Sequence, residues 1–158
     1  MRRNLFNLML VCLMTLLFMA FAGCAREKEF SKAGMTITLT TDFVENDIVT
    51  QTAYYVSQKA IVTALKEDGS ALGSYTVEQY AKLVCKANNL SDSTVTVKDN
   101  YAEFTYEKEL NGKEYFYYAR CLKNGTDYWL FQFACETKNS EKYMPTFEKW
   151  ASTIKFDA

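Results

Sequence analysis

The chain has 158 residues, with 18 Lys and Arg against 19 Asp and Glu and no histidine. This length suits a single domain with a sizeable hydrophobic core, and the net charge of −1 provides no basic footprint for nucleic acid. The absence of histidine removes the commonest general base, a common zinc ligand and every His-dependent catalytic triad. We therefore expect no nucleic-acid partner, no metal site and no cofactor.

The N-terminus has the layout of a secretory signal peptide. Two arginines precede an uncharged, largely apolar run over residues 5–22, and Ala22 and Gly23 lead into Cys24. A transmembrane helix is the alternative, since roughly 20 apolar residues span a bilayer, but the small residues directly before the cysteine favour cleavage. The sequence therefore predicts a signal peptide over residues 1–23.

The end of this segment resembles the lipobox of bacterial lipoproteins, in which signal peptidase II cuts before a cysteine that carries a diacylglyceryl group. Ala22, Gly23 and Cys24 match the lipobox, whereas Phe21 stands where an aliphatic residue is usual. The resemblance implies that Cys24 is acylated, that membrane lipid is a partner, and that the chain lies on the extracytoplasmic face of the cell membrane. Lysine is much commoner than arginine, which points to an AT-rich genome and a Gram-positive bacterium.

The region after the predicted cleavage point divides into a tether and a domain. Residues 24–34 are mostly polar or small and have little periodicity, so we expect a flexible tether to the lipid. The folded domain is expected over residues 35–158. It opens with apolar residues that alternate with threonines over residues 35–41, which predicts a half-buried strand.

The next elements are a second β-rich stretch and a helix. Residues 52–58 favour a strand, whereas residues 60–66 suit either a strand or a helix. Apolar residues recur at helical spacing over residues 74–90. Thr76, with a glutamine three places later, has the spacing of a capping box at the start of that helix.

Three turn signals predict an antiparallel meander of four strands in the second half. Asn111-Gly112 and Asn124-Gly125 suit a type I′ hairpin turn, in which both central residues have positive φ, and Asp99-Asn100 is a weaker third signal. If each dipeptide is a two-residue loop, the residues on either side of it pair directly. The expected pairs are Lys98 with Tyr101, Leu110 with Lys113, and Lys123 with Thr126.

The predicted meander is apolar on both faces over part of its width. One face is apolar on every strand, whereas the other is polar at one side and aromatic at the other. A second helix is expected over residues 142–154, beginning close to Pro145, because proline is tolerated only in a first helical turn. We therefore predict an α+β fold in which helices flank both faces of a central antiparallel β-sheet, an α/β/α sandwich.

The cysteines of the predicted domain are odd in number, and Cys121 and Cys135 point to opposite faces of adjacent strands. A disulfide between these two would require a slip in register. We interpret all the cysteines of the domain as small buried apolar residues, and Cys85 is the first nucleophile to test if the chain is an enzyme.

Carboxylates offer a second route to catalysis. Glu103 and Glu107 lie on one face of a predicted strand, as a general acid and a general base would require. In the predicted register Glu103 lies directly across from Arg120, so an ion pair on the surface of the sheet is the preferred interpretation.

Tyrosines are the remaining candidates for function, because aromatic rings supply contact area for a glycan or a peptide at low entropic cost. Core packing, with the hydroxyl reaching water, is the commoner role of tyrosine on a strand. The possible binding surface consists of Tyr54, Tyr55, Tyr115, Tyr117, Tyr118 and Tyr128.

In the order of its elements, the domain resembles small bacterial lipoproteins with a PsbP-like fold. The residues that carry this resemblance are the opening strand 35–43, the stretch 46–68, the aromatic strand 127–135 and the C-terminal segment 145–156. The resemblance implies a central antiparallel sheet between helices. Plant members of the family are extrinsic subunits of the oxygen-evolving photosystem with histidine at metal-associated positions. This chain has no histidine, so neither a metal nor a photosynthetic role carries over.

These observations predict a membrane-anchored, extracytoplasmic lipoprotein that acts as a non-enzymatic binding or accessory domain, with an envelope protein or a glycan as its partner. Two alternatives stay open. One is an envelope enzyme that depends on carboxylates or on the thiol of Cys85, and the other is a structural subunit of an envelope complex. A large exposed aromatic patch favours binding, whereas a concave pocket with convergent carboxylates favours an enzyme.

Overall fold

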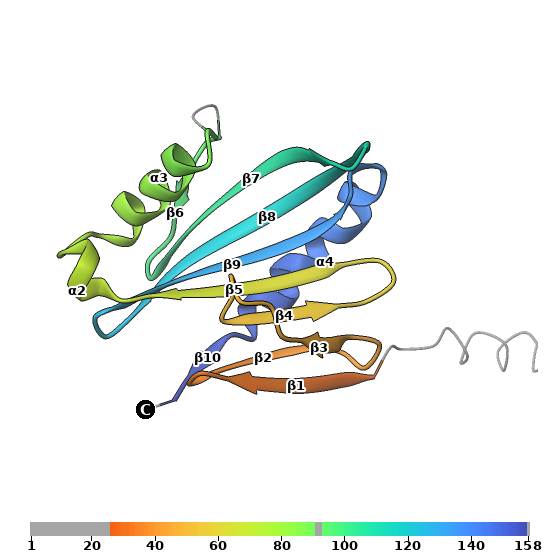
Figure 1. Ribbon diagram of the computed structural model, residues 1–158, viewed down its shortest axis with the longest axis horizontal. Coiled ribbons are helices and arrows are strands. Elements are labelled where there is room, and N and C mark those ends of the chain that lie inside the picture. The colour runs from red at the N-terminus through yellow and green to blue at the C-terminus, as the bar shows by residue number, and fades with distance from the viewer. Residues whose placement is uncertain (1–25, 91–92, 158) are drawn as a thin grey trace, which may run out of the picture.

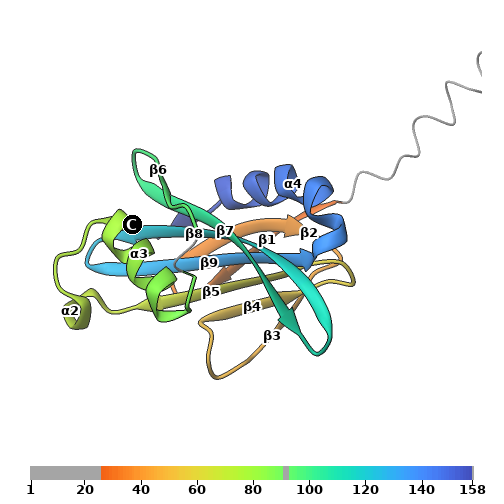
Figure 2. The ribbon, with the colours of Figure 1, turned by 90° about the horizontal axis from the view of Figure 1, so that it is seen from above.

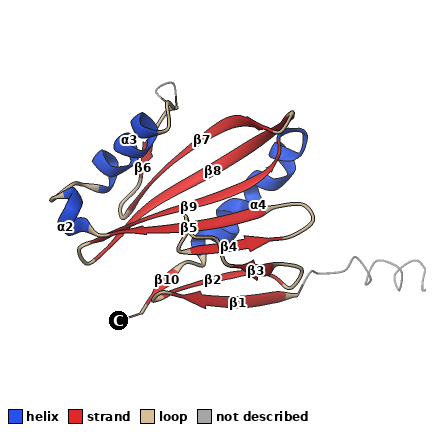
Figure 3. Cartoon of the chain, viewed as in Figure 1, coloured by secondary structure: helices blue, strands red, loops and turns tan. Residues whose placement is uncertain are grey.

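The computed structural model describes residues 26–90 and 93–157. These residues form a mixed α and β fold with two antiparallel sheets, one of seven strands and one of three (Figures 1 and 3). The predicted signal peptide and Cys24 lie outside the described residues. In the described part of the chain, no helix combines the length and the apolar character needed to cross a membrane.

The three-stranded sheet contains β1 (Glu27–Lys32), β2 (Met35–Thr40) and β10 (Lys155–Phe156) in the order β1-β2-β10. The alternation predicted from residue 35 is confirmed, because every second side chain of β2 is buried. The flexible tether predicted over residues 24–34 is wrong for β1, which pairs with β2 along its whole length. The side chain of Phe30 holds β1 against the core, because it is buried and its ring centroid lies 4.9 Å from that of Tyr55.

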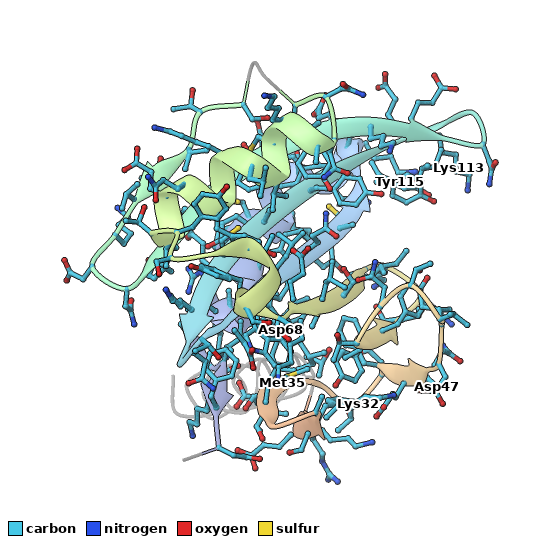
Figure 4. The ribbon with its side chains drawn as sticks, turned by 60° about the vertical axis from the view of Figure 1, so that its left-hand side comes forward. Lys32, Met35, Asp47, Asp68, Lys113 and Tyr115 are labelled. Carbon is cyan, nitrogen blue, oxygen red and sulfur yellow. The ribbon has the colours of Figure 1, made fainter. Side chains whose placement is uncertain are left out.

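The seven-stranded sheet contains β3 (Val44–Asn46), β4 (Ala53–Val56), β5 (Ile61–Glu67), β6 (Thr96–Val97), β7 (Tyr101–Leu110), β8 (Lys113–Asn124) and β9 (Asp127–Glu136). Its strand order is β3-β4-β5-β9-β8-β7-β6. Residues 60–66, which suit either a strand or a helix, lie almost wholly in strand β5. Lys32 links the two sheets, because its Nζ lies 2.8 Å from Glu45 and 2.5 Å from Asp47 (Figure 4).

The predicted hairpin pairs hold at two of the three turns. Leu110 pairs with Lys113, with positive φ at both Asn111 and Gly112, and the amide of Lys98 donates to the carbonyl of Tyr101 at 2.9 Å. At the third turn the structure corrects the pairing of Lys123 with Thr126. Asn124 pairs with Asp127 instead, and the loop is Gly125-Thr126 with φ of 60° at Gly125, as in a type II′ turn. This shift of two residues keeps every side chain on its predicted face.

The helices are α2 (Gly69–Leu72), α3 (Val77–Ala87) and α4 (Ser140–Ser152), the last preceded by a 3-10 turn over Thr137–Asn139. The capping box of α3 is confirmed. The amide of Gln79 donates to Thr76 Oγ1 at 3.2 Å, and the amide of Thr76 donates to Gln79 Oε1 at 2.9 Å.

Helix α4 begins earlier than predicted, so that Pro145 lies inside it. Proline lacks an amide hydrogen and therefore removes one intrahelical hydrogen bond. Packing offsets that loss, because Tyr143 and Met144 pack against the core and the ring of Tyr143 lies 5.5 Å from that of Phe147. Burial of the residues before Pro145 thus outweighs the local preference.

The seven-stranded sheet is covered on its two faces by different elements. Helix α3 packs through Tyr80, Ala81 and Val84 against one face, where Ala102, Phe104, Ala119 and Cys121 are buried. The opposite face buries β9 residues such as Phe131 and Phe133 in one core with residues of α4 and of the three-stranded sheet. Figure 2 shows α4 on the side of the seven-stranded sheet away from α3. Strands as well as a helix therefore cover that face, whereas the predicted sandwich had only helices as cover.

Candidate binding surface

Helix α3 leaves part of its face of the sheet uncovered, and half-buried tyrosines gather there. Side chains on directly opposed residues share a face, as do alternate residues of one strand. Tyr115, on β8, lies beyond the end of α3 (Figure 4). We define the tyrosine face as Tyr54, Thr63, Tyr106, Tyr115, Tyr117 and Gln132, which are all half-buried.

The groups of the tyrosine face are ordered by contacts with one another. The rings of Tyr106 and Tyr117 stack across β7 and β8 with centroids 4.6 Å apart and an interplanar angle of 2°. Gln132 Nε2 donates to the hydroxyl of Tyr106 at 2.7 Å, and Thr63 Oγ1 donates to Gln132 Oε1 at 3.3 Å. A polar chain therefore runs from β5 over β9 to β7 beside the stacked rings.

The tyrosine face is electrically neutral. None of its side chains is an acid or a base that ionises near pH 7, and burial raises the pKa values of Tyr106 and Tyr117 above the ordinary tyrosine value. Their hydroxyls therefore stay protonated at physiological pH. Flat rings with neighbouring amide and hydroxyl groups suit an uncharged ligand that has both apolar C–H surface and hydroxyl groups.

The structure divides the predicted tyrosines into two groups. Tyr54, Tyr115 and Tyr117 lie on the tyrosine face, whereas Tyr55, Tyr118 and Tyr128 are 0%, 1% and 0% exposed. The buried group therefore does not contribute to a binding surface. Adjacent residues of a strand point to opposite faces, which separates Tyr54 from Tyr55 and Tyr117 from Tyr118.

Tyr106 belongs to the tyrosine face although the sequence-based set omits it. The Asn111-Gly112 turn fixes the register in which Tyr106 lies directly opposite Tyr117. The same turn signal therefore predicts from the sequence that Tyr106 shares a face with Tyr117.

The predicted carboxylate pair is not brought together as an acid–base site. Glu103 does lie opposite Arg120, with 3.4 Å between Glu103 Oε2 and Arg120 Nη2, but Arg120 is only 7% exposed. The sequence predicts an ion pair on the surface, and the structure corrects this, because Arg120 is buried and Glu103 is half-buried. Glu107 is exposed and lies opposite Phe116, further along the hairpin.

The cysteines Cys85, Cys121 and Cys135 are buried, free thiols. As predicted, Cys121 and Cys135 lie on opposite faces, the first packed with α3 and the second with the α4 side of the sheet. Cys85 borders a cavity of about 570 Å³ beside α3, but burial raises the pKa of its thiol. A raised thiol pKa lowers the fraction of reactive thiolate, so this position is unfavourable for a nucleophile.

Comparisons with known proteins show similarity in structure only. No family model matches the sequence, and no curated protein matches it. The solution structure of cyanobacterial PsbP (CyanoP) from Synechocystis sp. PCC 6803 superposes with a TM-score of 0.51 at 11% identity, covering 86% of this chain and 95% of that one. The expected PsbP-like fold is thereby supported.

Two further solved structures share the fold. LpqN of Mycobacterium tuberculosis, which is described as involved in cell envelope biogenesis, gives a TM-score of 0.51 at 11% identity over 84% of this chain and 91% of that one. The Ran-binding protein Mog1p of Saccharomyces cerevisiae gives 0.57 at 8% identity over 84% of this chain and 96% of that one. At such identities the likeness concerns the fold alone.

Proposed function

We propose that this chain is a lipid-anchored, extracytoplasmic and non-enzymatic accessory domain that binds a glycan of the cell envelope on the tyrosine face. The observation that carries the proposal is the neutral, half-exposed array of stacked rings beside the Thr63–Gln132–Tyr106 hydrogen bonds. Sugar rings present apolar C–H faces to aromatic rings and hydroxyl groups to amides. A non-enzymatic role is supported by the raised pKa of Cys85 and by the engagement of Glu103 with Arg120.

The predicted anchor is the lipobox cysteine Cys24, and the position of β1 determines how far the folded domain lies from it. The carbonyl of Arg26 accepts a hydrogen bond from the amide of Thr41 at 2.8 Å, and β1 begins at Glu27. Consecutive Cα atoms are about 3.8 Å apart, so acylated Cys24 would hold the domain within roughly 8 Å of chain from its lipid. The domain would therefore sit directly on the membrane surface rather than at the end of a long tether.

A membrane fractionation experiment tests the anchor. The Cys24→Ala variant should move from the membrane fraction to the soluble or culture fraction, because no acyl chain can be attached. Equal retention of wild type and variant in the membrane would show that the lipobox assignment is wrong.

Co-sedimentation with purified peptidoglycan tests the glycan-binding surface. We expect Tyr115→Ala and Tyr117→Ala to weaken binding about tenfold, corresponding to about 1.4 kcal/mol, since each removes one aromatic ring from the tyrosine face. Tyr75→Ala is the matched control, because Tyr75 is 38% exposed and lies between α2 and α3, outside the tyrosine face.

The outcomes separate the possible partners. Binding of wild type that is lost in the Tyr115 and Tyr117 variants but kept in the Tyr75 variant supports the proposal. Absence of wild-type binding to peptidoglycan, or equal loss in all three variants, contradicts it. In-cell crosslinking from position 115 that captures only a protein would redirect the proposal to a protein partner.

A further inference from the structure

On the opposite face of the sheet, a cavity of about 510 Å³ opens between β7, β8 and the C-terminal part of α4. We propose that this cavity is a second binding site, for a small monocarboxylate with an apolar body, and that Arg120 receives the carboxylate. This site is distinct from the tyrosine face, and the inference therefore goes beyond the function proposed above.

The guanidinium of Arg120 is held in a fixed position. Its Nε and Nη2 donate to the hydroxyl of Tyr118 at 3.0 and 2.6 Å, and that hydroxyl donates to Glu103 Oε2 at 2.5 Å. The ring of Tyr101 lies 4.0 Å from Arg120 Cζ, at a distance that gives a cation–π contact. A ligand therefore meets a cation that has already lost its conformational freedom, which reduces the entropic cost of binding.

The guanidinium of Arg120 has one nitrogen, Nη1, without a hydrogen-bond acceptor among the described residues. Across residues 26–90 and 93–157, no hydrogen bond is donated by Nη1 of Arg120, and Nη1 is not among the buried polar atoms that lack a partner. Nη1 therefore keeps some exposure to solvent, and Arg120 is one of the residues that line the cavity. Its two N–H groups point to an acceptor, and a carboxylate gives the strong charge-assisted form of that hydrogen bond.

The remaining lining determines the class of ligand. Lys98 and Arg120 are balanced by Glu103 and Glu148, so the cavity has no excess positive charge with which to hold a dianion such as phosphate. A single negative charge next to Arg120 is the better match. Leu122 and Ile154 supply apolar lining for the rest of the ligand.

Ligand-observed 19F NMR on the full chain tests this site with 4-fluorophenylacetate as the probe. Its methyl ester is the uncharged control, and 4-fluorophenylphosphonate is the dianionic one. We expect saturable line broadening for the acid, at least about tenfold weaker binding for either control, and at least about tenfold weaker binding of the acid by Arg120→Lys. The lysine variant keeps the charge but loses Nη1.

A second variant keeps the test valid if Arg120→Lys does not fold. Ser152 is exposed at the rim of the cavity, so Ser152→Trp should fill the opening and abolish probe binding. Lys86→Trp, an exposed position at the cavity on the α3 face, is its matched control and should bind the probe like wild type. No saturable binding by wild type, equal binding of acid and ester, or unchanged binding in Ser152→Trp would each overturn the inference. Peptidoglycan co-sedimentation should be unaffected by Ser152→Trp, so the two proposals fail independently.

Discussion

Strand β8 presents two neighbouring tyrosines to opposite faces of the sheet, and the hydroxyls of these tyrosines have opposite surroundings. On the α4 face, Arg120, Glu103 and Tyr118 are largely withdrawn from water and satisfy one another by hydrogen bonds. On the α3 face, Tyr117 is only half-buried, and among the described residues its hydroxyl donates or accepts no hydrogen bond. The hydrogen bonds that join Arg120, Tyr118 and Glu103 are therefore needed for stability, whereas the hydroxyl of Tyr117 is available to a ligand.

The largest effect is expected at Arg120. Arg120→Met should lower the free energy of unfolding by about 3 kcal/mol, because it leaves the carboxylate of Glu103 and the hydroxyl of Tyr118 without their cationic partner. Urea denaturation followed by tryptophan fluorescence measures this loss. A loss below about 1 kcal/mol would mean that solvent already stabilises Glu103 and that the network contributes little.

Adjacent tyrosines on the two faces give a matched pair of smaller effects. Tyr118→Phe should cost about 2 kcal/mol, since it removes the hydroxyl that joins Arg120 to Glu103. Tyr117→Phe should cost less than about 0.5 kcal/mol in the same denaturation experiment. Equal costs for the two substitutions would contradict the contrast between the faces.

Alkaline pH provides a third test, through a tyrosine of the buried group. Burial raises the pKa of Tyr55 to about 12, and its hydroxyl has no partner within the described part of the chain. The unfolded chain releases this proton near pH 10 and the folded chain only near pH 12, so stability is full below pH 10 and is lost as the pH rises toward 12.

Urea denaturation at pH 9 and pH 11 measures this alkaline loss, with Tyr55→Phe as the comparison. The variant should lose less stability than wild type between the two pH values, because it has no proton to release at this position. At pH 9 it should be as stable as wild type or slightly more stable, since no hydrogen bond of the described residues is removed. An identical alkaline loss in both proteins would exclude Tyr55 as its source.

The smallest effect concerns the thiol beside α3. Iodoacetamide should alkylate Cys85 at pH 7.5 at least about tenfold more slowly in the folded protein than in urea, since burial both shields the thiol and raises its pKa. Mass spectrometry of the digested protein gives the rate for each cysteine. Rapid alkylation of Cys85 in the folded state would reopen the hypothesis of a thiol-dependent enzyme.

Local turn chemistry made much of the sheet predictable. Asn111-Gly112 fixed the β7–β8 register, and with it the opposition of Glu103 and Arg120. At the next turn two loops fit the sequence, Asn124-Gly125 and Gly125-Thr126, and the strand pairings that they produce differ by two residues. The positive φ at Gly125, without one at Asn124, identifies the second loop. Because both loops preserve the alternation of faces, the composition of each face was correct even where the pairing was not.

The features that were not predictable depend on contacts between distant segments. Strand β1 contains one buried apolar residue, Phe30, among charged and polar ones, so it has no periodic signal of its own. The burial of Arg120 depends on α4, whose residues Ala151 and Ser152 close one side of its cavity. The sequence identified the partner of Arg120 on the next strand, but not the helix that packs over both.

The most direct test of the binding function is a nitration footprint of the full chain with tetranitromethane, in the presence and absence of soluble peptidoglycan fragments. Mass spectrometry would report each tyrosine separately. We predict that Tyr54, Tyr115 and Tyr117 are nitrated in the free protein and protected by the fragments, while Tyr75 is nitrated in both states and buried Tyr55 in neither. Unchanged nitration of Tyr54, Tyr115 and Tyr117 at saturating fragment concentration would contradict the assignment of the tyrosine face as the binding surface.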